Sequence, residues 1–251
     1  NCESVYTKPF PKDQVINELY TQGNYGKYQD KLVKSGKQIR KGTLDERKFS
    51  QISSLIKNKT DKIKILDIGC GSGEISKLLS AKAGSNGNVQ GVDISKPLLE
   101  LAFKKYGHMQ NIKFLNADAQ SFRFKLSFYD QIISRFGVMF FENPVVAFRN
   151  IHRSLKSNGR LDFICWSALE DNEFFFLPLQ IVLKYLNKPH PKPSTEPGPL
   201  AFSSKSYLSQ TLESSGFNKI TIKTINTEML KLNSGNASYN RFTNPFSTTY
   251  V

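Results

Sequence analysis

One strand-turn-helix unit constrains the fold of this chain more than any other stretch. The run Ile63 to Ile68 has the length and the β-branched content of a buried strand. Three glycines at alternate positions then break the run: Gly69, Gly71 and Gly73. The segment Glu74 to Ala83 follows with the apolar periodicity of an amphipathic helix. A strand, a glycine turn and a helix in this order predict one unit of a parallel α/β sheet.

The glycine turn is also the first candidate for a ligand site. Glycines let the chain turn tightly and let a ligand approach backbone N–H groups without a Cβ in the way. The spacing G-x-G-x-G differs from the dinucleotide fingerprint, and Asp67 stands where a pyrophosphate would be repelled. The next strand, Asn88 to Val92, ends in Asp93, about 20 residues beyond the glycines, where a carboxylate can accept hydrogen bonds from ribose hydroxyls. We therefore expect a nucleoside that carries a positive charge instead of phosphates.

Strands and helices continue to alternate after Asp93. Ser95 is the expected N-cap of a helix with Pro97 in its first turn. Further strands are predicted at 111–116, 129–134, 160–166 and 219–226, and further helices at 13–54, 144–156, 173–186 and 206–215. Met229 to Leu232 is a candidate antiparallel partner for the last strand, and we expect a polar, irregular tail from Asn233 to Val251.

From about Lys62 to Trp166, with a weaker continuation to about Asn226, the sequence resembles the class I S-adenosylmethionine-dependent methyltransferases. The similar motifs are ILDIGCGSG, VQGVDIS, FLNADAQSF, YDQIISRFGVMFF and LKSNGRLDFICW. The last of these has Ser157-Asn158-Gly159 where the family has Pro-Gly-Gly, and asparagine also tolerates the positive φ of such a turn. Within the family, the stretch after the fourth strand is most similar to the small-molecule branch related to ubiquinone and menaquinone biosynthesis methyltransferases.

The resemblance implies a fold and a cofactor. The implied fold is a Rossmann-like α/β sheet of seven mostly parallel strands, the last one antiparallel, with helices on both faces. The implied organisation is an N-terminal helical cap (1–61), a cofactor-binding core (62–166), an acceptor lid with a proline-rich loop (167–204) and a C-terminal part (205–251). S-adenosylmethionine is the implied cofactor, and its expected contacts are Asp67, Gly69, Cys70, Gly71, Gly73, Asp93, Ile94, Asp118, Ala119, Ser134, Arg135, and Tyr25 and Tyr28 from the cap.

Several of these residues have a second interpretation. A ring face of Tyr25 or Tyr28 could attract a sulfonium by cation–π contact, or it could simply pack in the cap. Cys70 is expected to act as a small packing group, without chemistry of its own. Arg135 is the candidate catalytic residue, because a guanidinium could hold an acidic or enolate-bearing acceptor, but an arginine at a strand end also forms structural ion pairs. His152 lies beyond the expected ligand edge, so a packed or solvent-facing histidine is favoured over a general base.

The acceptor side is predicted from aromatic residues. Phe136, Phe174 and Phe175 are the expected acceptor contacts, and the apolar stretch Phe174 to Leu179 is interpreted as a lid, with core packing of an extra helix as the alternative. The proline-rich loop Pro189 to Pro199 could move over the site. We expect methyl transfer to a small, largely apolar acceptor. The alternatives are a methyltransferase that acts on RNA or protein, and a cofactor-binding scaffold without activity.

Composition bears on the partner, the metal content and the location that we expect of the protein. The formal net charge is +14, and between Lys27 and Lys64 there are twelve basic residues against four acids. A nucleic-acid partner is one interpretation of this segment, and a solvated lysine-rich surface is favoured because no aromatic-interleaved stripe accompanies it. Three cysteines and three histidines at no metal-ligand spacing speak against structural zinc, so no metal is expected. Without an apolar run near about 18 residues or a signal-peptide pattern, we expect no membrane span and a cytoplasmic location.

Overall fold

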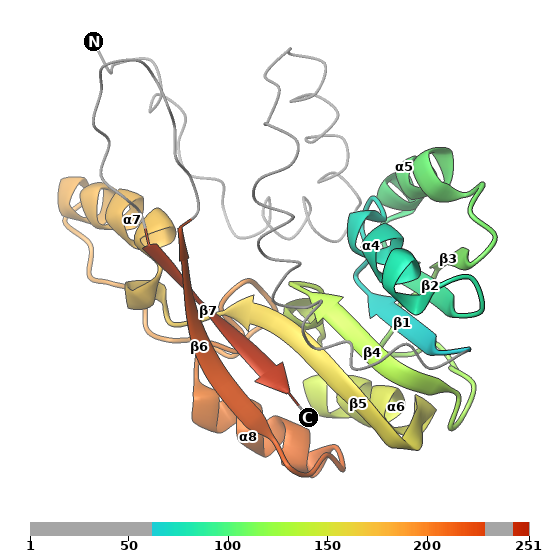
Figure 1. Cartoon of the computed structure of the whole chain (residues 1–251). Helices are drawn as coiled ribbons and strands as arrows, with labels where there is room; N and C mark the ends of the chain where they lie inside the picture. The colour runs from blue at the N-terminus through green and yellow to red at the C-terminus, as the bar shows by residue number, and fades with distance from the viewer. Residues whose placement is uncertain (1–61, 229–242, 251) are drawn as a thin grey trace.

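The protein is described here by a computed structural model that covers residues 62–228 and 243–250. Its centre is a seven-stranded sheet in the order β3-β2-β1-β4-β5-β7-β6 (Figure 1). The strands are β1 (Lys64–Ile68), β2 (Asn88–Asp93), β3 (Ile112–Asn116), β4 (Tyr129–Arg135), β5 (Leu155–Trp166), β6 (Thr221–Glu228) and β7 (Thr243–Tyr250). Strands β1 to β5 pair in parallel, which confirms the predicted Rossmann-like α/β sheet, and β7 runs antiparallel to both β5 and β6.

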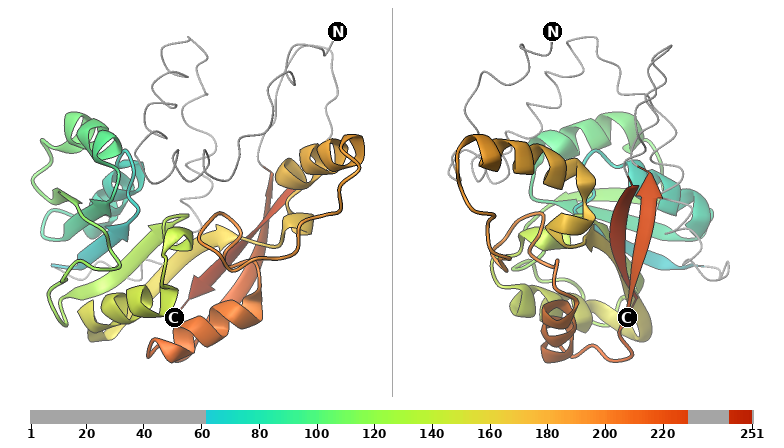
Figure 2. Two further views of the ribbon diagram at one scale, coloured as in Figure 1. Left: turned by 180° about the vertical axis from the view of Figure 1, so that it is seen from behind. Right: turned by 90° about the vertical axis from the view of Figure 1, so that its left-hand side faces the viewer.

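Helices cover both faces of this sheet. They are α4 (Glu74–Ala83), α5 (Lys96–Tyr106), α6 (Pro144–Ser154), α7 (Glu173–Tyr185) and α8 (Lys205–Ser214), with two short 3-10 turns, η1 (Val138–Phe140) and η2 (Leu169–Asp171). Figures 1 and 2 show α4 and α5 together over the end of the sheet formed by β1 to β3, whereas α6 and α8 lie on the other face. None of the helices in the described ranges combines the length and the apolar composition that a bilayer crossing requires.

The core has two layers because side chains alternate along each strand. In β1, Ile65 packs with Leu79 of α4, and Leu66 belongs to the cluster on the opposite face that contains Phe148 of α6. Because Ile65 and Leu66 point to opposite faces of the sheet, the carboxyl end of β1 lies between the two layers of the core. The chain crosses from one side of β1 to the other between β3 and β4, and in open parallel sheets ligands bind where the strand order reverses, at the carboxyl ends of the strands.

Two expectations about irregular segments need correction. The tail predicted to be irregular contains β7, and Met229 to Leu232 lies outside the described residues, as do the predicted cap and its helix. Pro245 obscured this strand, because proline cannot donate to a ladder and is confined to strand edges and ends. In the structure Pro245 pairs only with Asn226 of β6, and pairing with β5 begins one residue later, at Phe246. The strand therefore tolerates its proline.

The turn before the fifth strand also differs in detail. Helix α6 ends at Ser154, and β5 begins directly at Leu155, which pairs with Tyr129. The next paired residues are Gln131 and Arg160, so the segment between them forms a bulge within β5. Asn158 is not among the described residues with positive φ. Ser157, Asn158 and Gly159 therefore lie inside β5, and the separate turn that we expected before this strand is not formed in the described residues.

Candidate functional site

The glycine turn at the end of β1 is built around a close backbone approach. Gly69, Gly71 and Gly73 all have left-handed φ angles, of 70°, 54° and 86°. A Cβ on Gly69 would lie 2.7 Å from the Cα of Gly137, which follows β4. A Cβ on Gly137 would in turn lie 2.7 Å from the carbonyl oxygen of Ile68. The ends of β1 and β4 therefore touch through two glycines, with room for no side chain between them.

Gly71 lies at the open point of the turn. Among the described residues a Cβ there would meet only Leu98 Cδ1, at 4.0 Å, so no described atom fills the space beside its backbone. Its N–H donates to Oδ2 of Asp93 at 2.7 Å, and Ser95 N–H donates to Oδ1 of the same carboxylate at 2.8 Å. A carboxylate has about four acceptor sites, so each oxygen of Asp93 can still accept a further hydrogen bond. Burial raises the pKa of Asp93, against these backbone donors.

Asp67 lies below the turn, inside the protein. Only 1% of its surface is exposed, and the hydroxyl of Ser76 in α4 donates to its Oδ2 at 2.6 Å. Burial raises the pKa of Asp67 to about 7, with a smaller contribution from the negative charge of Asp93. The Ser76 hydrogen bond and the positive charge of Arg135 lower it. Asp67 therefore changes charge near neutral pH, beside the candidate cofactor space.

Two predicted cofactor contacts have a packing role in the structure. Gly73 is buried, and a Cβ there would lie 2.9 Å from Phe114 and 3.1 Å from the Cβ of Ala102, so it permits close packing on α5 and β3. The Cys70 side chain is buried too, and burial raises the pKa of its thiol well above the usual range. Because a neutral, buried thiol is a poor nucleophile, Cys70 acts as the expected packing group.

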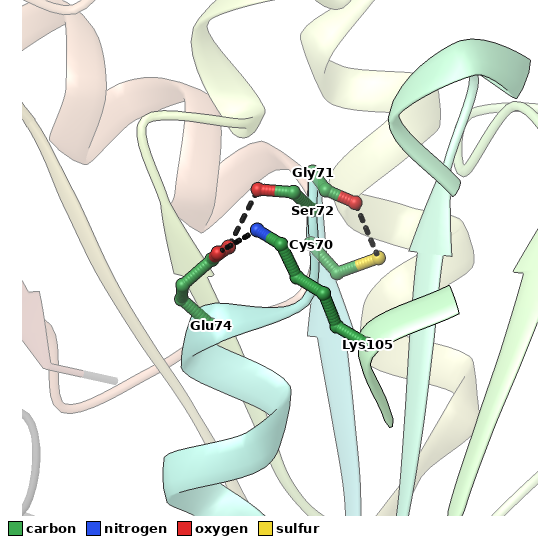
Figure 3. A network of polar contacts seen from close by, with 5 residues as sticks. All are labelled: Cys70, Gly71, Ser72, Glu74 and Lys105. Atoms are coloured by element: carbon green, nitrogen blue, oxygen red, sulfur yellow. Dashed lines mark hydrogen bonds and ion pairs between the residues drawn. The ribbon is translucent and has the colours of Figure 1, made fainter. Parts of the chain in front are cut away.

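Polar side chains tie the turn to its neighbours on α4 and α5 (Figure 3). Ser72 donates to one carboxylate oxygen of Glu74 at 2.6 Å, and Lys105 of α5 contacts the other at 2.5 Å. Glu74 is in the first turn of α4, where a negative charge is favoured by the helix dipole. The contacts link both helices at the rim of the turn. Their groups are well exposed, so the ion pair itself adds little stability.

The exit of β3 forms the next wall. Asn116 donates to the carbonyls of Asp93 and Ile94, both at 3.0 Å, and so fixes the end of β3 beside that of β2. Asp118 accepts from Gln120 N–H and from the Ser121 hydroxyl, both at 2.9 Å, which closes a turn after the strand. The predicted contacts Asp118, Ala119 and Ile94 thus lie along one edge. The Ile94 side chain is 64% exposed there, which offers an apolar surface to a ring.

The loop that carries Ala119 is held from the opposite helix layer. Asn150 of α6 donates to the carbonyls of Ala119 at 3.0 Å and Phe122 at 2.8 Å. The N–H of Asn143, the N-cap of α6, donates to the side chain of Gln120. Sequence reasoning missed Asn150, because a lone asparagine in an amphipathic helix has no local signal for a contact 31 residues away.

The fourth strand delivers three predicted residues to this edge. The Ser134 hydroxyl donates to the Ile68 carbonyl at 2.7 Å and so ties β4 to β1. Arg135 is half-buried and acts electrostatically on Asp67. Phe136 has a φ of 60°, which is uncommon for a bulky residue, and its ring stacks on Trp166 at 4.8 Å between centroids and 14° between planes. An aromatic wall therefore stands beside Gly69 and Gly137. Sequence reasoning used Trp166 only as a strand end.

The remaining predicted residues either lie away from this edge or fall outside the description. The ring of His152 in α6 packs edge-on against Phe217 at 4.8 Å, so the interpretation as a packed histidine is confirmed. Phe174 and Phe175 lie in the first turn of α7, and their side chains are outside the description, as are Tyr25 and Tyr28. Farther along the lid stretch, no described side chain from Phe176 to Leu179 is buried, so packing into the sheet core does not describe them.

Comparison with known proteins gives the class. Residues 66–163 match the family model described as a methyltransferase domain. The strand order, the glycine turn and this match are those of the class I S-adenosylmethionine-dependent methyltransferases, a family whose cofactor is S-adenosylmethionine. Among characterised proteins the chain is similar to the demethylmenaquinone methyltransferase of Staphylococcus haemolyticus. That match has 29% identity over 170 residues, covering 64% of this chain and 70% of the relative.

Solved structures agree on the fold. A SAM-dependent methyltransferase of Thermotoga maritima superimposes with a TM-score of 0.59 at 15% identity, covering 92% of this chain and 98% of the other. A phosphoethanolamine N-methyltransferase of Haemonchus contortus, in complex with its phosphorylated substrate and S-adenosylhomocysteine, gives 0.55 at 17% identity. That match covers 72% of this chain but 38% of the other, so the present chain spans less than half of that enzyme.

Proposed function

We propose that this chain transfers a methyl group from S-adenosylmethionine to a small, largely apolar acceptor at the carboxyl edge of β1 and β4. The observation that carries the proposal is the space beside Gly71 that no described atom fills, next to Asp93, which the exposed Ile94 follows in the chain. A nucleoside fits these residues, because the remaining acceptor sites of Asp93 suit ribose hydroxyls and Ile94 suits a flat ring. Asp118 and Ala119 are the proposed contacts of the base.

The reaction requires few groups from the protein. Bound S-adenosylmethionine supplies an activated methyl group on a sulfonium, so the protein contributes mainly alignment and exclusion of water. We assign Asp67 the role of a negative charge that favours a cationic ligand over a neutral one. The contact between Gly69 and Gly137 closes the floor of the site, which keeps water from entering between β1 and β4. A general base is needed only where the acceptor carries a proton to remove.

The acceptor is proposed from the aromatic wall. Phe136 and Trp166 stack at the ends of β4 and β5, and an aromatic pair at this edge suits a planar aromatic acceptor. The name of the staphylococcal relative specifies demethylmenaquinone, whose quinone ring has this chemistry. We therefore propose a quinone-type acceptor in its reduced form. Arg135 at the same edge is the candidate catalytic residue, placed to favour a developing oxyanion on the ring.

Product formation tests the acceptor class. The full chain is incubated with S-adenosylmethionine and either a reduced short-chain demethylmenaquinone or total RNA, and S-adenosylhomocysteine is measured. We expect product with the quinol and none with RNA. Trp166→Ala should form about fivefold less product, because ring stacking is worth about 1 kcal/mol beyond the area it buries. Product with RNA alone would replace this proposal by a nucleic-acid methyltransferase. Tight cofactor binding without product from either acceptor would favour a scaffold.

Cofactor binding is tested separately at Asp93. Asp93→Ala removes both the proposed ribose acceptor and the acceptor of the Gly71 N–H. Calorimetry should show a loss of S-adenosylhomocysteine affinity of about 1–3 kcal/mol, which is the cost of leaving buried polar groups unpaired. Glu100→Ala, at an exposed position on α5, serves as the control for the loss of a carboxylate. Equal affinities in the two variants would remove Asp93 from the site.

A further inference from the structure

Helix α7 differs from the other helices in what it leaves exposed. Helices α4, α5, α6 and α8 each bury several side chains in the core. In α7, by contrast, no side chain from Phe176 to Tyr185 is buried, although this stretch has the sequence FLPLQIVLKY. Ile181 is 69% exposed and Tyr185 is 89% exposed. A helix that is apolar on most sides normally lies in a core or a lipid phase.

The exposed apolar residues form one stripe. Leu177, Ile181 and Tyr185 recur every four residues, so they lie above one another on the same side of α7, and the exposed Leu186 follows at its end. Figures 1 and 2 show α7 projecting at the β6–β7 end of the molecule, away from α4 and α5. Contiguous apolar patches of this kind mark surfaces for another molecule or for a membrane.

Cationic groups border this stripe. A depression of about 350 Å³ opens beside it, lined by Gln180, Leu183, Lys184, Lys188 and His190. Lys184 is seven positions after Leu177, so it lies on the same side of the helix as the stripe. The ring of Phe176 stacks on His190 at 5.5 Å, which folds the following loop back onto the helix. Lys184 and Lys188 therefore lie between the apolar stripe and the depression.

We propose that α7 is a docking surface for an anionic phospholipid bilayer. Leu177, Ile181 and Tyr185 would enter the interface, while Lys184 and Lys188 bind phosphate headgroups at the depression. An interfacial helix has this division, with an apolar side in the acyl boundary and lysines at headgroup level. The net charge of +14 favours the same kind of surface. The inference goes beyond the proposed function and does not depend on it, since it concerns where the protein sits and not what it methylates.

A bilayer docked on α7 would also lie near the proposed methyl-transfer site. Helix α7 begins at Glu173, a short distance along the chain after Trp166, whose ring belongs to the aromatic wall. A docked α7 therefore brings the acceptor side of the site close to the membrane surface. An acceptor with an apolar tail would then reach the site without leaving the lipid phase.

Vesicle sedimentation tests this proposal with the full chain. We expect binding to vesicles of phosphatidylcholine mixed with phosphatidylglycerol, weaker binding to phosphatidylcholine alone, and a decrease with added salt. Lys184→Glu with Lys188→Glu should lower the binding constant by at least about twentyfold, since each lysine near an anionic surface contributes about fivefold. Ile181→Ser should lower it by about tenfold, because the isoleucine no longer enters the interface.

Matched variants at the other end of the molecule are the controls. Lys82→Glu with Lys104→Glu changes the net charge equally at exposed positions of α4 and α5. Leu126→Ser removes an apolar side chain that is 57% exposed in the loop before β4. Both controls should bind vesicles like the wild type. All variants should bind S-adenosylhomocysteine unchanged, which separates this result from the proposed function.

Several results would overturn the proposal. One is the absence of binding to anionic vesicles, or binding that neither α7 variant weakens. Sedimentation velocity that shows a dimer lost in Ile181→Ser would assign the stripe to a second copy of the chain. A fall in melting temperature for Ile181→Ser, absent in Leu126→Ser, would assign it to the chain's own packing. Displacement of the protein from vesicles by soluble glycerol 3-phosphate would assign the depression to a free phosphate compound.

Discussion

Gly71 and Gly84 both have a positive φ, so replacing each of them separates backbone strain from ligand binding. Their φ angles are 54° and 73°, and among the described residues a Cβ on either would meet no atom closer than 4.0 Å. An alanine at either position should therefore destabilise the fold by about 1–3 kcal/mol, the cost of a positive φ for a non-glycine residue. Only at Gly71 does the new methyl group also occupy the proposed ligand space. We expect Gly71→Ala to lower cofactor affinity at least tenfold and Gly84→Ala to leave it unchanged.

The measurement is calorimetric titration with S-adenosylhomocysteine, alongside urea unfolding of both variants. A loss of unfolding free energy in both variants, with a loss of affinity in Gly71→Ala alone, would support a ligand beside Gly71. If the two variants lose affinity equally, the effect comes from general destabilisation, and the turn is not the binding surface.

The raised pKa of Asp67 predicts that the preference for S-adenosylmethionine over S-adenosylhomocysteine depends on pH. Its pKa is raised to about 7 by burial, so about one tenth of the side chain is ionised at pH 6 and about nine tenths at pH 8. An anion at this place favours the sulfonium of S-adenosylmethionine over the neutral sulfur of S-adenosylhomocysteine. The ratio of the two affinities should therefore rise as pH rises through 7, by on the order of 1 kcal/mol. Other titrating groups common to both ligands cancel in this ratio.

Two substitutions check the assignment to Asp67. Asp67→Asn should make the affinity ratio independent of pH. Ser76→Ala removes the hydrogen bond that lowers the pKa of Asp67, so the midpoint of the rise should move to higher pH. A pH dependence that survives in Asp67→Asn would assign the effect to another group.

At the scale of elements, Asn150 connects the two helix layers through a loop. Its amide donates to the carbonyls of Ala119 and Phe122 and holds the turn after β3. Asn111 makes similar contacts, donating to the carbonyls of Ser80 and Gly84 at the far end of α4. Replacing either by alanine leaves carbonyls without a donor and should lower the unfolding free energy by about 1–2 kcal/mol.

The two variants should differ in cofactor binding. Asn150→Ala frees the loop that carries the proposed base contacts, so we expect severalfold weaker binding of S-adenosylhomocysteine by calorimetry. Asn111→Ala should bind like the wild type, since its contacts lie at the opposite edge of the sheet. Unchanged binding in Asn150→Ala would show that the loop after β3 does not contribute to the site.

Elements with a local signal could be predicted from the sequence. Helix α4 has the bounds that apolar periodicity predicted, Glu74 to Ala83, and each strand from β1 to β4 begins or ends within one residue of its prediction. Strand β7 could not be predicted, because Pro245 argues locally against a strand and its partners lie far away in sequence. The bulge in β5 was missed for a related reason, since the pairing with β4 fixes it and no turn residue does.

The residues of the candidate site also fall into those that could be predicted from the sequence and those that could not. The acids and glycines at strand ends, such as Asp93 and Gly71, could be predicted because their spacing relative to a strand carries the signal. Gly137 and Trp166 could not, because their roles depend on contacts between the ends of different strands, with Gly69 and Phe136. The packing of Gly73 on α5 could not be predicted either, because it depends on contacts with Phe114 and Ala102, and its contact with the ligand stays a prediction.

For the whole molecule, buried carboxylates set how stability depends on pH. Asp162 lies in the middle of β5 with 1% of its surface exposed. It accepts a hydrogen bond from Gln131 and forms an ion pair with Arg160 at 3.0 Å, yet Oδ1 of Asp162 and Nη2 of Arg160 have no hydrogen-bond partner among the described residues. Burial therefore raises its pKa to about 6, despite the charge of Arg160. The folded protein holds a proton here that the unfolded chain releases at lower pH.

The sign of the effect follows from this difference. Between pH 4 and pH 6 the folded state binds more protons at Asp162 than the unfolded state does, so its contribution to stability is lost as pH rises through this window. A shift from 3.8 to about 6 corresponds to about 3 kcal/mol. Asp162→Asn has no such proton. Relative to the wild type, the variant should therefore gain up to about 3 kcal/mol of unfolding free energy between pH 4 and pH 8, whatever its stability at either end. Urea unfolding of both proteins across this range measures the difference. Asp67 titrates near pH 7 with the same sign, so the gain in unfolding free energy of Asp67→Asn relative to the wild type should appear at higher pH. If the unfolding free energies of the wild type and Asp162→Asn change in parallel with pH, Asp162 is ionised throughout the range.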